Sequence, residues 1–173
     1  KYHRIIFGID SINNINKLTK NDFISIFGNV FEKSNWIAEK VYLSIPFNSF
    51  TELKDKFIET FESETNESHL KILLSHPDLG VKQKMTVDSK KEQTHSELDK
   101  CSKEQIEKFK LLNKDYKQSF GFPFIVCVSG MDRFKILNLF EKRINNNKNS
   151  EFEEAKIQVK KIALLRLEKI NKE

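Results

Sequence analysis

The sequence predicts an all-α protein, and two observations support that prediction. The chain has only 5 glycines and 3 prolines in 173 residues, too few for a β-sandwich or β-barrel that needs a turn every few residues. Apolar residues recur at three- and four-residue steps along most of the chain, which is the spacing of amphipathic helices. We expect a single compact multi-helix domain over residues 18–173, preceded by an N-terminal extension of residues 1–17.

The first half of the chain contains signals for four helices. Thr19, Ser34 and Ser49 are helix-capping residue types, and an apolar helix face follows each of them. Thr19 and Ser49 are also followed three residues later by an acid, as in a capping box. A fourth, short apolar run at 69–74 must end before His76, because the residue that precedes a proline is pushed out of the α region.

The second half contains signals for a loop and four further helices. The loop spans residues 78–88, and a polar, helix-favouring stretch begins at Ser89. Ser102 opens a capping box for the next helix. A helix is expected at 134–144, and a last capping box is expected to open a helix at 150–170. Seven or eight helices are therefore predicted.

One segment does not fit this helical pattern. The run FGFPFIVCV at 120–128, called the extended segment below, has the continuous apolar character of a buried strand, but no second strand is predicted to pair with it. Its main-chain groups therefore need other partners. Loops and helix ends supply them, or a helix begins at Phe124, or some of these groups face a ligand that the extended segment lines.

Composition narrows the function classes. The net charge of +5 comes from 30 basic and 25 acidic residues that are interleaved along the chain, so we expect no nucleic-acid partner. No apolar run approaches the roughly 20 residues that span a bilayer. Cys101 and Cys127 have no metal-site spacing, which favours reduced thiols in an intracellular protein. We find no secretory signal in the first residues and no peroxisomal signal at the C-terminus.

Among the four histidines, His76 stands out as a candidate for chemistry. It lies at a predicted helix end beside a proline, although such a position also suits an ordinary turn residue. Glu92 and His95 have the Glu-x-x-His spacing of di-iron bundles, but no second pair of this kind exists in the chain, so no metal site is predicted.

Three polar residues, Ser89, Glu92 and Gln93, lie within about one predicted helical turn. A capping box with Ser89 as the N-cap explains the first two and leaves Gln93 unexplained.

Arg166 interrupts an apolar helix face formed by Val159, Ile162 and Ile170. A buried arginine normally needs an anionic or hydrogen-bonding partner. That partner is either an acidic side chain on a neighbouring helix or a carboxylate of a ligand.

Four motifs, in this order, resemble the OHCU decarboxylases, whose full name is 2-oxo-4-hydroxy-4-carboxy-5-ureidoimidazoline decarboxylases. They are SHPDLG at 75–80, SKKEQ at 89–93, FGFPFIVCV at 120–128 and IALLRL at 162–167. The opening NDFISIFGNVFEKSNWIAEKVY also resembles the first helical pair of that family, so the resemblance covers roughly residues 18–170.

The resemblance implies an all-helical carboxy-lyase, a homodimer in the cytoplasm or peroxisome, that acts in urate (purine) degradation. It implies decarboxylation of a ureidoimidazoline carboxylate to (S)-allantoin with no cofactor and no metal. The implied catalytic residues are His76, as acid/base, and Glu92. The implied substrate-binding residues are Pro77, Ser89, Glu92, Gln93, Phe124, Ile125, Val126, Cys127, Val128 and Arg166.

The first motif departs from the usual form of that family, which is His-Pro-Asp-Leu-Ala-Gly-Arg. Here Gly80 directly follows Leu79, no arginine comes next, and the loop up to Ser89 is several residues shorter. The departure leaves a second interpretation open, a catalytically silent helical binding or scaffold module derived from the same family.

Overall fold

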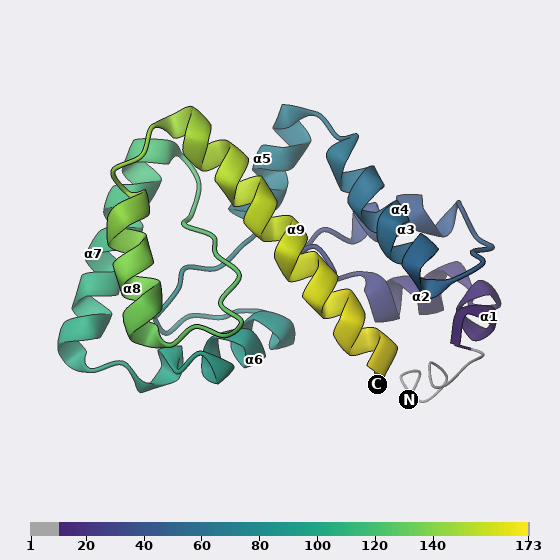
Figure 1. Cartoon of the computed structure of the whole chain (residues 1–173), viewed down its shortest axis with the longest axis horizontal. Helices are drawn as coiled ribbons and strands as arrows, with labels where there is room; N and C mark the ends of the chain where they lie inside the picture. Colours follow the sequence, from purple (N-terminus) through teal and green to yellow (C-terminus); the bar gives the residue numbers. More distant parts are fainter. Residues whose placement is uncertain (1–10, 173) are drawn as a thin grey trace. The chain divides into compact units, whose positions relative to one another are not determined.

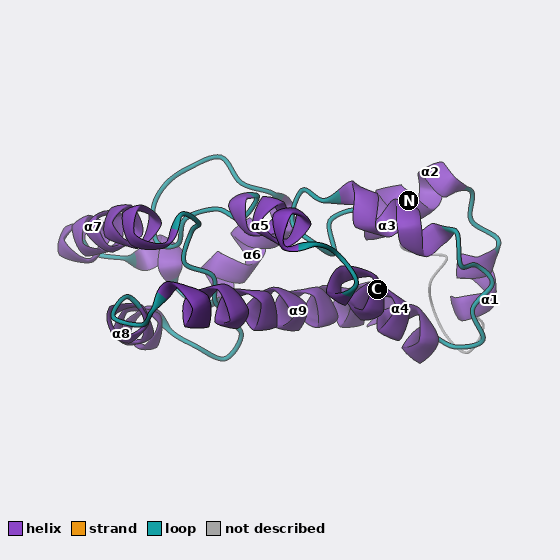
Figure 2. Ribbon diagram, turned by 90° about the horizontal axis from the view of Figure 1, so that it is seen from above, coloured by secondary structure: helices purple, strands orange, loops and turns teal. Residues whose placement is uncertain are grey.

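The computed structural model describes residues 11–172, and all regular structure in this range is helical. Figure 2 shows helices and loops with no strand among these residues, so the predicted all-α class is confirmed. No helix of the described range is both long and apolar enough to cross a membrane. The elements (Figure 1) are, in order, α1 Ser11–Asn16, α2 Lys20–Phe27, α3 Asn35–Tyr42, α4 Phe50–Glu62, α5 Asn66–Leu74, α6 Val87–His95, the 3₁₀ helix η2 Leu98–Lys100, α7 Lys103–Phe120, α8 Arg133–Arg143 and α9 Lys148–Lys172.

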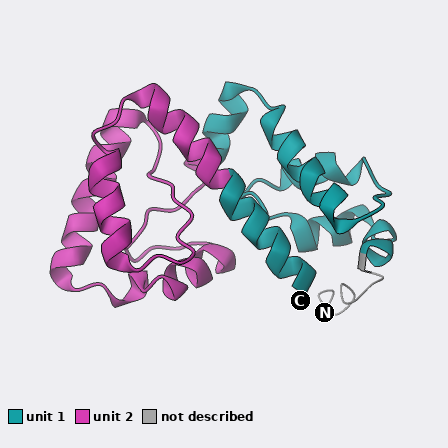
Figure 3. Cartoon of the chain, in the orientation of Figure 1, with its two compact units in different colours: residues 1–72, 160–173 teal, residues 73–159 magenta. Residues whose placement is uncertain are grey.

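The chain forms two compact units (Figure 3). Among the described residues, the first unit comprises those up to 72 and those from 160 onward, and the second unit comprises residues 73–159. Helix α1 was not predicted, yet its Ile15 has no exposed surface. It lies in the stretch that was assigned to an N-terminal extension. The division into residues 1–17 and 18–173 stays a prediction.

Stacked phenylalanines form the core of the first unit. Phe23 and Phe27 on α2 pack against Phe57 on α4, with ring centroids 6.3 and 5.9 Å from that ring. Phe31 stacks on Phe61 with centroids 4.9 Å apart. Rings at these distances bury large apolar areas and add favourable quadrupole contacts. The apolar faces predicted after Thr19 and Ser49 therefore form this core.

The helix starts agree with the sequence in part. Thr19 accepts a hydrogen bond from the Asp22 N–H at 3.2 Å, as predicted. Ser34 precedes α3, but its hydroxyl makes no capping bond and donates instead to the Glu32 carbonyl at 2.9 Å. The capping box predicted at Ser150 is wrong, because α9 begins at Lys148 and the Ser150 N–H donates to the Asn147 side chain at 2.8 Å.

A buried polar network crosses the otherwise aromatic core of the second unit. The Glu151 carboxylate, which has no exposed surface, accepts hydrogen bonds from the Tyr116 hydroxyl and from Arg143 Nε, the latter at 3.0 Å. Asn146 donates to the same carboxylate at 3.0 Å. The Arg143 guanidinium also lies 4.5 Å from the centroid of the Phe124 ring. These contacts connect α7, α8 and α9 to the extended segment.

This network makes a prediction about alkaline pH. Burial and the adjacent Glu151 carboxylate raise the pKa of the Tyr116 phenol above its ordinary value. The folded protein therefore keeps Tyr116 protonated at a pH where the unfolded chain, with a phenol pKa of about 10, releases the proton. The stability due to Tyr116 is full below about pH 10 and falls by about 1.4 kcal/mol per pH unit above it.

Urea unfolding of the wild type and Tyr116→Phe at pH 8 and pH 11 measures this effect. At pH 8 the variant should be less stable by about 1.5–3 kcal/mol, because Glu151 loses a hydrogen bond to a charged acceptor. At pH 11 that difference should shrink. A difference independent of pH would contradict the prediction.

Candidate active site

His76 lies just beyond a helix end, as the sequence predicts. Helix α5 ends at Leu74, and the His76 N–H donates to the Leu73 carbonyl at 3.2 Å to close the last turn. The side chain is half-buried. Because Pro77 prevents the helix from continuing, the imidazole is carried on the first residues of a loop rather than on a helix face.

The loop that follows His76 is held by side chains from α6 and α7. The Gln93 side-chain amide donates to the Asp78 carbonyl at 3.2 Å and accepts from the Gly80 N–H at 3.3 Å. Asn113 donates to the Leu79 carbonyl at 3.0 Å. Both atoms of the Gln93 amide are thus used to fix the backbone directly after His76 and Pro77.

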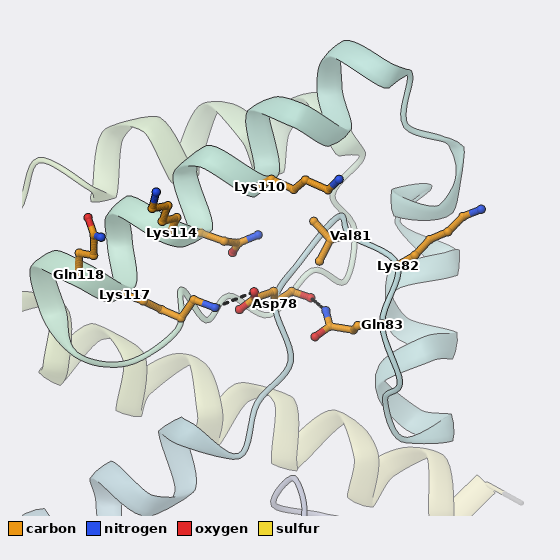
Figure 4. Close-up of a pocket in the computed structure, with 9 residues that line it drawn as sticks. Asp78, Val81, Lys82, Gln83, Lys110, Lys114, Lys117 and Gln118 are labelled. Carbon is orange, nitrogen blue, oxygen red and sulfur yellow. Dashed lines mark hydrogen bonds and ion pairs between the residues drawn. The ribbon is translucent and has the colours of Figure 1, made fainter.

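The outer side of this loop borders a wide groove next to α7 (Figure 4). The groove has a volume of about 520 Å³, and lysines such as Lys110 and Lys114 line it. Lys117 forms an ion pair with Asp78 at 2.8 Å, and Gln83 donates to the Asp78 carbonyl at 2.6 Å. None of the predicted site residues lines this groove. The predicted site is therefore a different place from the groove.

Gly80 is required by close packing as well as by its backbone conformation. Its φ of +72° lies in the left-handed region, and a Cβ at this position would come within 2.4 Å of the Phe109 ring. Only glycine therefore lets the loop lie directly against α7 at this point.

Helix α6 begins earlier than predicted, and the proposed capping role of Ser89 is wrong. The N-cap is Thr86, whose hydroxyl accepts from the Ser89 N–H at 3.3 Å. Ser89 is therefore inside the helix, where it is only 5% exposed. Ser89 and Gln93 are buried one turn apart, and Glu92 beside them is half-buried. Residues spaced by three and four lie on one helix face, so these three side chains form a polar face of α6.

The extended segment is not a helix. Helix α7 ends at Phe120, Gly121 caps it with a φ of +81°, and residues 122–128 have no regular secondary structure. The alternative of a helix beginning at Phe124 is wrong. Every residue from 122 to 128 is buried except Cys127, which is half-buried. The segment thus places main-chain polar groups in the interior of the second unit.

Three side chains bind main-chain groups of the extended segment. Arg143 Nη1 donates to the Ile125 carbonyl at 2.7 Å, and the Gln158 side-chain oxygen accepts from the Cys127 N–H at 2.9 Å. The Ser96 hydroxyl donates to the Val128 carbonyl at 2.7 Å. These side chains thus supply the hydrogen bonds to the main chain that a neighbouring strand would supply in a sheet.

Val126 lies between two of these bonded groups. It is 5% exposed, yet its N–H and C=O have no hydrogen-bond partner within residues 11–172. Buried main-chain groups are almost always paired with protein, water or a ligand. Val126, like Phe124 two residues earlier, therefore offers a main-chain donor and acceptor that a bound molecule could pair.

Arg166 belongs to the first unit and is 4% exposed. Its Nη1 donates to the Asn29 carbonyl at 2.8 Å and to Glu32, an acid with no exposed surface, at 3.2 Å. The acidic partner considered from the sequence therefore exists. A contact between Arg166 and a ligand stays a prediction.

The structure adds residues that the sequence did not single out, namely Ser96, Asn113, Arg143 and Gln158. Arg143 and Gln158 bind partners 18 and 31 positions away, so no local pattern indicates their roles. The one available signal is the burial of Asn113 and Arg143 on helix faces that are otherwise apolar. Neither cysteine forms a disulfide, and no group of three or more potential metal ligands occurs in the described range.

The packing of Gly80 predicts that adding a single methyl group at this position strongly lowers the stability of the fold. Gly80→Ala should lower the free energy of unfolding by about 1–2 kcal/mol for the left-handed conformation, and by about 1–3 kcal/mol more for the overlap with Phe109. Gly130→Ala is the matched control, because Gly130 has a φ of +75° but nothing within 4 Å of the position that a Cβ would take. Urea unfolding of both variants checks this, and equal losses would show that Phe109 moves aside at no cost.

Comparison with known proteins identifies the family. The OHCU decarboxylase family model matches residues 16–168. A 2-oxo-4-hydroxy-4-carboxy-5-ureidoimidazoline decarboxylase of Haloferax volcanii is 37% identical over 91% of this chain and 94% of its own length. A uric acid degradation bifunctional protein of Bacillus sp. (strain TB-90) is also 37% identical over 92% of this chain, which spans only 32% of that protein. The fold matches a crystal structure of (S)-allantoin synthase with a TM-score of 0.75 at 23% identity, over 92% of this chain and 53% of that one. The chain belongs to the OHCU decarboxylase family.

Proposed function

We propose that this chain is a carboxy-lyase that converts 2-oxo-4-hydroxy-4-carboxy-5-ureidoimidazoline to (S)-allantoin in urate degradation. The observation that carries the proposal is the match to the Haloferax volcanii decarboxylase, which covers nearly the whole of both chains. The polar face of α6, the His76 loop and the unpaired groups of Val126 belong to one compact unit, which supports a site for a small polar substrate.

The reaction needs little from the protein beyond positioning and one proton. The bond from the ring carbon to the carboxylate breaks, CO₂ leaves, and the electron pair stays on the carbon. The neighbouring C=N bond of the ring takes up this electron pair at its nitrogen, which is protonated, and an enol is left. The enol hydroxyl then loses its proton and becomes a carbonyl, while a proton adds to the adjacent, ureido-bearing carbon. The protein has to orient and desolvate the carboxylate and to deliver that proton to one face.

His76 is the residue that we assign to proton transfer. An imidazole titrates close to neutral pH, which suits a general acid or base. Its place just after a helix end, on a loop whose backbone is fixed by Gln93, supports the assignment because general acid–base catalysis requires a fixed distance to the substrate.

The polar face of α6 supplies the second group of proposed contacts. Glu92, half-buried in the middle of the helix, is assigned to orient the imidazole or a substrate N–H. Ser89 is assigned to hydrogen-bond the substrate, and Pro77 to line the site. Gln93 already holds the His76 loop, so we assign it to positioning that loop as well as to the substrate.

Residues Phe124–Val128 supply the third group, through their main chain. The ureido group of the substrate presents an N–H and a C=O, which complement the unpaired C=O and N–H of Val126. Pairing them restores hydrogen bonds that are otherwise costly to leave unmade in a buried place. We therefore propose that the substrate docks on Val126.

Arg166 is assigned to provide positive charge for the substrate carboxylate. A guanidinium has five N–H donors in a planar fork, so its bond to Glu32 and a contact with the substrate are compatible. The alternative is that Arg166 serves only to neutralise Glu32.

Two further properties are proposals of the same kind. We propose a homodimer, which sedimentation equilibrium tests directly, and a location in the cytoplasm or the peroxisome.

The proposed activity predicts an optically active product that depends on His76. The unstable substrate, prepared in situ from urate by the two preceding enzymes, decays by itself to racemic allantoin. The wild type should speed its loss and yield (S)-allantoin, as followed by circular dichroism. His76→Asn should abolish this stereospecific turnover while the thermal midpoint changes little, because the half-buried side chain adds little to the core.

A wild type that neither accelerates the loss nor yields optically active product would favour the scaffold interpretation. Full activity of His76→Asn would support the proposed reaction but would show that His76 is not its proton-transfer group.

The ion pair between Arg166 and Glu32 predicts that single and double variants differ in stability, and the double variant tests whether Arg166 binds the substrate. Arg166→Met leaves the buried Glu32 carboxylate without its cation, and breaking such a pair costs about 3–5 kcal/mol of stability. Glu32→Gln together with Arg166→Met removes both charges and should recover most of that loss. If Arg166 binds the substrate, the stable double variant stays inactive, whereas normal turnover of this variant would show that Arg166 serves only Glu32.

A further inference from the structure

The direction of the Val126 groups is set by its two neighbours. A trans peptide is planar, and its C=O and N–H point in opposite directions. The peptide between Ile125 and Val126 is fixed at its carbonyl by Arg143, so the Val126 N–H points away from Arg143. The next peptide is fixed at the Cys127 N–H by Gln158, so the Val126 C=O points away from Gln158.

We propose that Arg143 and Gln158 are positioning residues for catalysis, which orient the N–H and C=O of Val126 toward the substrate. The inference rests on the proposed function, since it concerns how the proposed substrate is held. Neither residue touches the substrate. Each acts by fixing the far end of one of the two peptide planes that meet at Val126.

The support behind both side chains fits this role. Arg143 has only 6% of its side chain exposed, and the Glu151 carboxylate, the Phe124 ring and the Ile125 carbonyl fix its orientation. Gln158 is held by Glu154 one turn earlier on α9, through a hydrogen bond of 3.3 Å. A side chain locked by its own contacts loses little freedom when it positions another group, which is the requirement for a precise site.

A purely structural role for Arg143 and Gln158 would be to satisfy buried main-chain groups. Satisfying the buried backbone requires partners for every polar group, including those of Val126. Arg143 and Gln158 instead bind the Ile125 C=O and the Cys127 N–H, which lie at the far ends of the two peptide planes that meet at Val126, and the Val126 N–H and C=O have no partner among the described residues.

Gln158 is the better residue to test, because it is half-buried, whereas Arg143 is tied to a buried carboxylate. Gln158→Met keeps the side-chain volume and removes the acceptor for the Cys127 N–H. We expect KM for the substrate to rise by about tenfold, the scale of one lost hydrogen bond. The thermal midpoint should fall by only about 2–4 °C, because a single hydrogen bond of the fold is lost. Gln118→Met, an exposed glutamine on α7, is the matched control and should change neither quantity.

A swapped pair provides the rescue. Glu154→Gln with Gln158→Glu keeps an oxygen acceptor at position 158 and an amide donor at 154, so the same two bonds can form in reverse. KM should return toward the wild-type value. An unchanged KM in Gln158→Met, or a swapped pair as impaired as Gln158→Met, would overturn the inference.

Amide hydrogen exchange at Val126 gives a readout that needs no altered fold. Addition of (S)-allantoin, the proposed product, should slow exchange of the Val126 N–H in the wild type and slow it much less in Gln158→Met. Equal protection in both proteins would overturn the inference even if Gln158→Met proved unstable in the kinetic assay. A wild type without turnover would count against the proposed function instead, so the two failures are distinguishable.

Discussion

The second unit depends on one buried ion pair, between Arg143 and Glu151, whose side chains are 6% and 0% exposed. Desolvation of two charges costs several kcal/mol per ion, and their attraction repays it only when other hydrogen bonds complete the site. Tyr116 and Asn146 donate to the carboxylate, and the Ile125 carbonyl accepts from the guanidinium. The pair is therefore stable only when α7, α8, α9 and the extended segment are all in place. It couples the helical packing to the course of that segment.

In a sheet, the N–H and C=O groups along both edges of a central strand form hydrogen bonds with the main chain of neighbouring strands. The extended segment has helices around it, and side chains can satisfy main-chain groups one at a time. Arg143, Gln158 and Ser96 do so at Ile125 O, Cys127 N–H and Val128 O. In the proposed site, this arrangement presents a backbone donor and acceptor to the substrate from the interior of an all-α protein, a kind of recognition that is otherwise typical of sheet edges.

The sequence predicts what local chemistry determines. The end of α5 before His76 follows from the proline rule alone, and the start of α7 follows from a capping box that the structure contains in full. The start of α6 could not be predicted in the same way, because Thr86 and Ser89 are both good capping residues and burial of Ser89 decides between them. The roles of Arg143 and Gln158 depend on distant partners, so only the folded chain reveals them.

The shortened loop after His76 is where the chain departs from the usual pattern of its family, and its structure argues against a lost site. Here the Asp78 carbonyl, the Leu79 carbonyl and the Gly80 N–H are each bound by a side chain from α6 or α7. Gln93 spans two of these groups, so the same helix face that carries Glu92 also sets the loop that carries His76. This coupling between the helix of Glu92 and the loop of His76 supports the proposed enzyme over a silent scaffold.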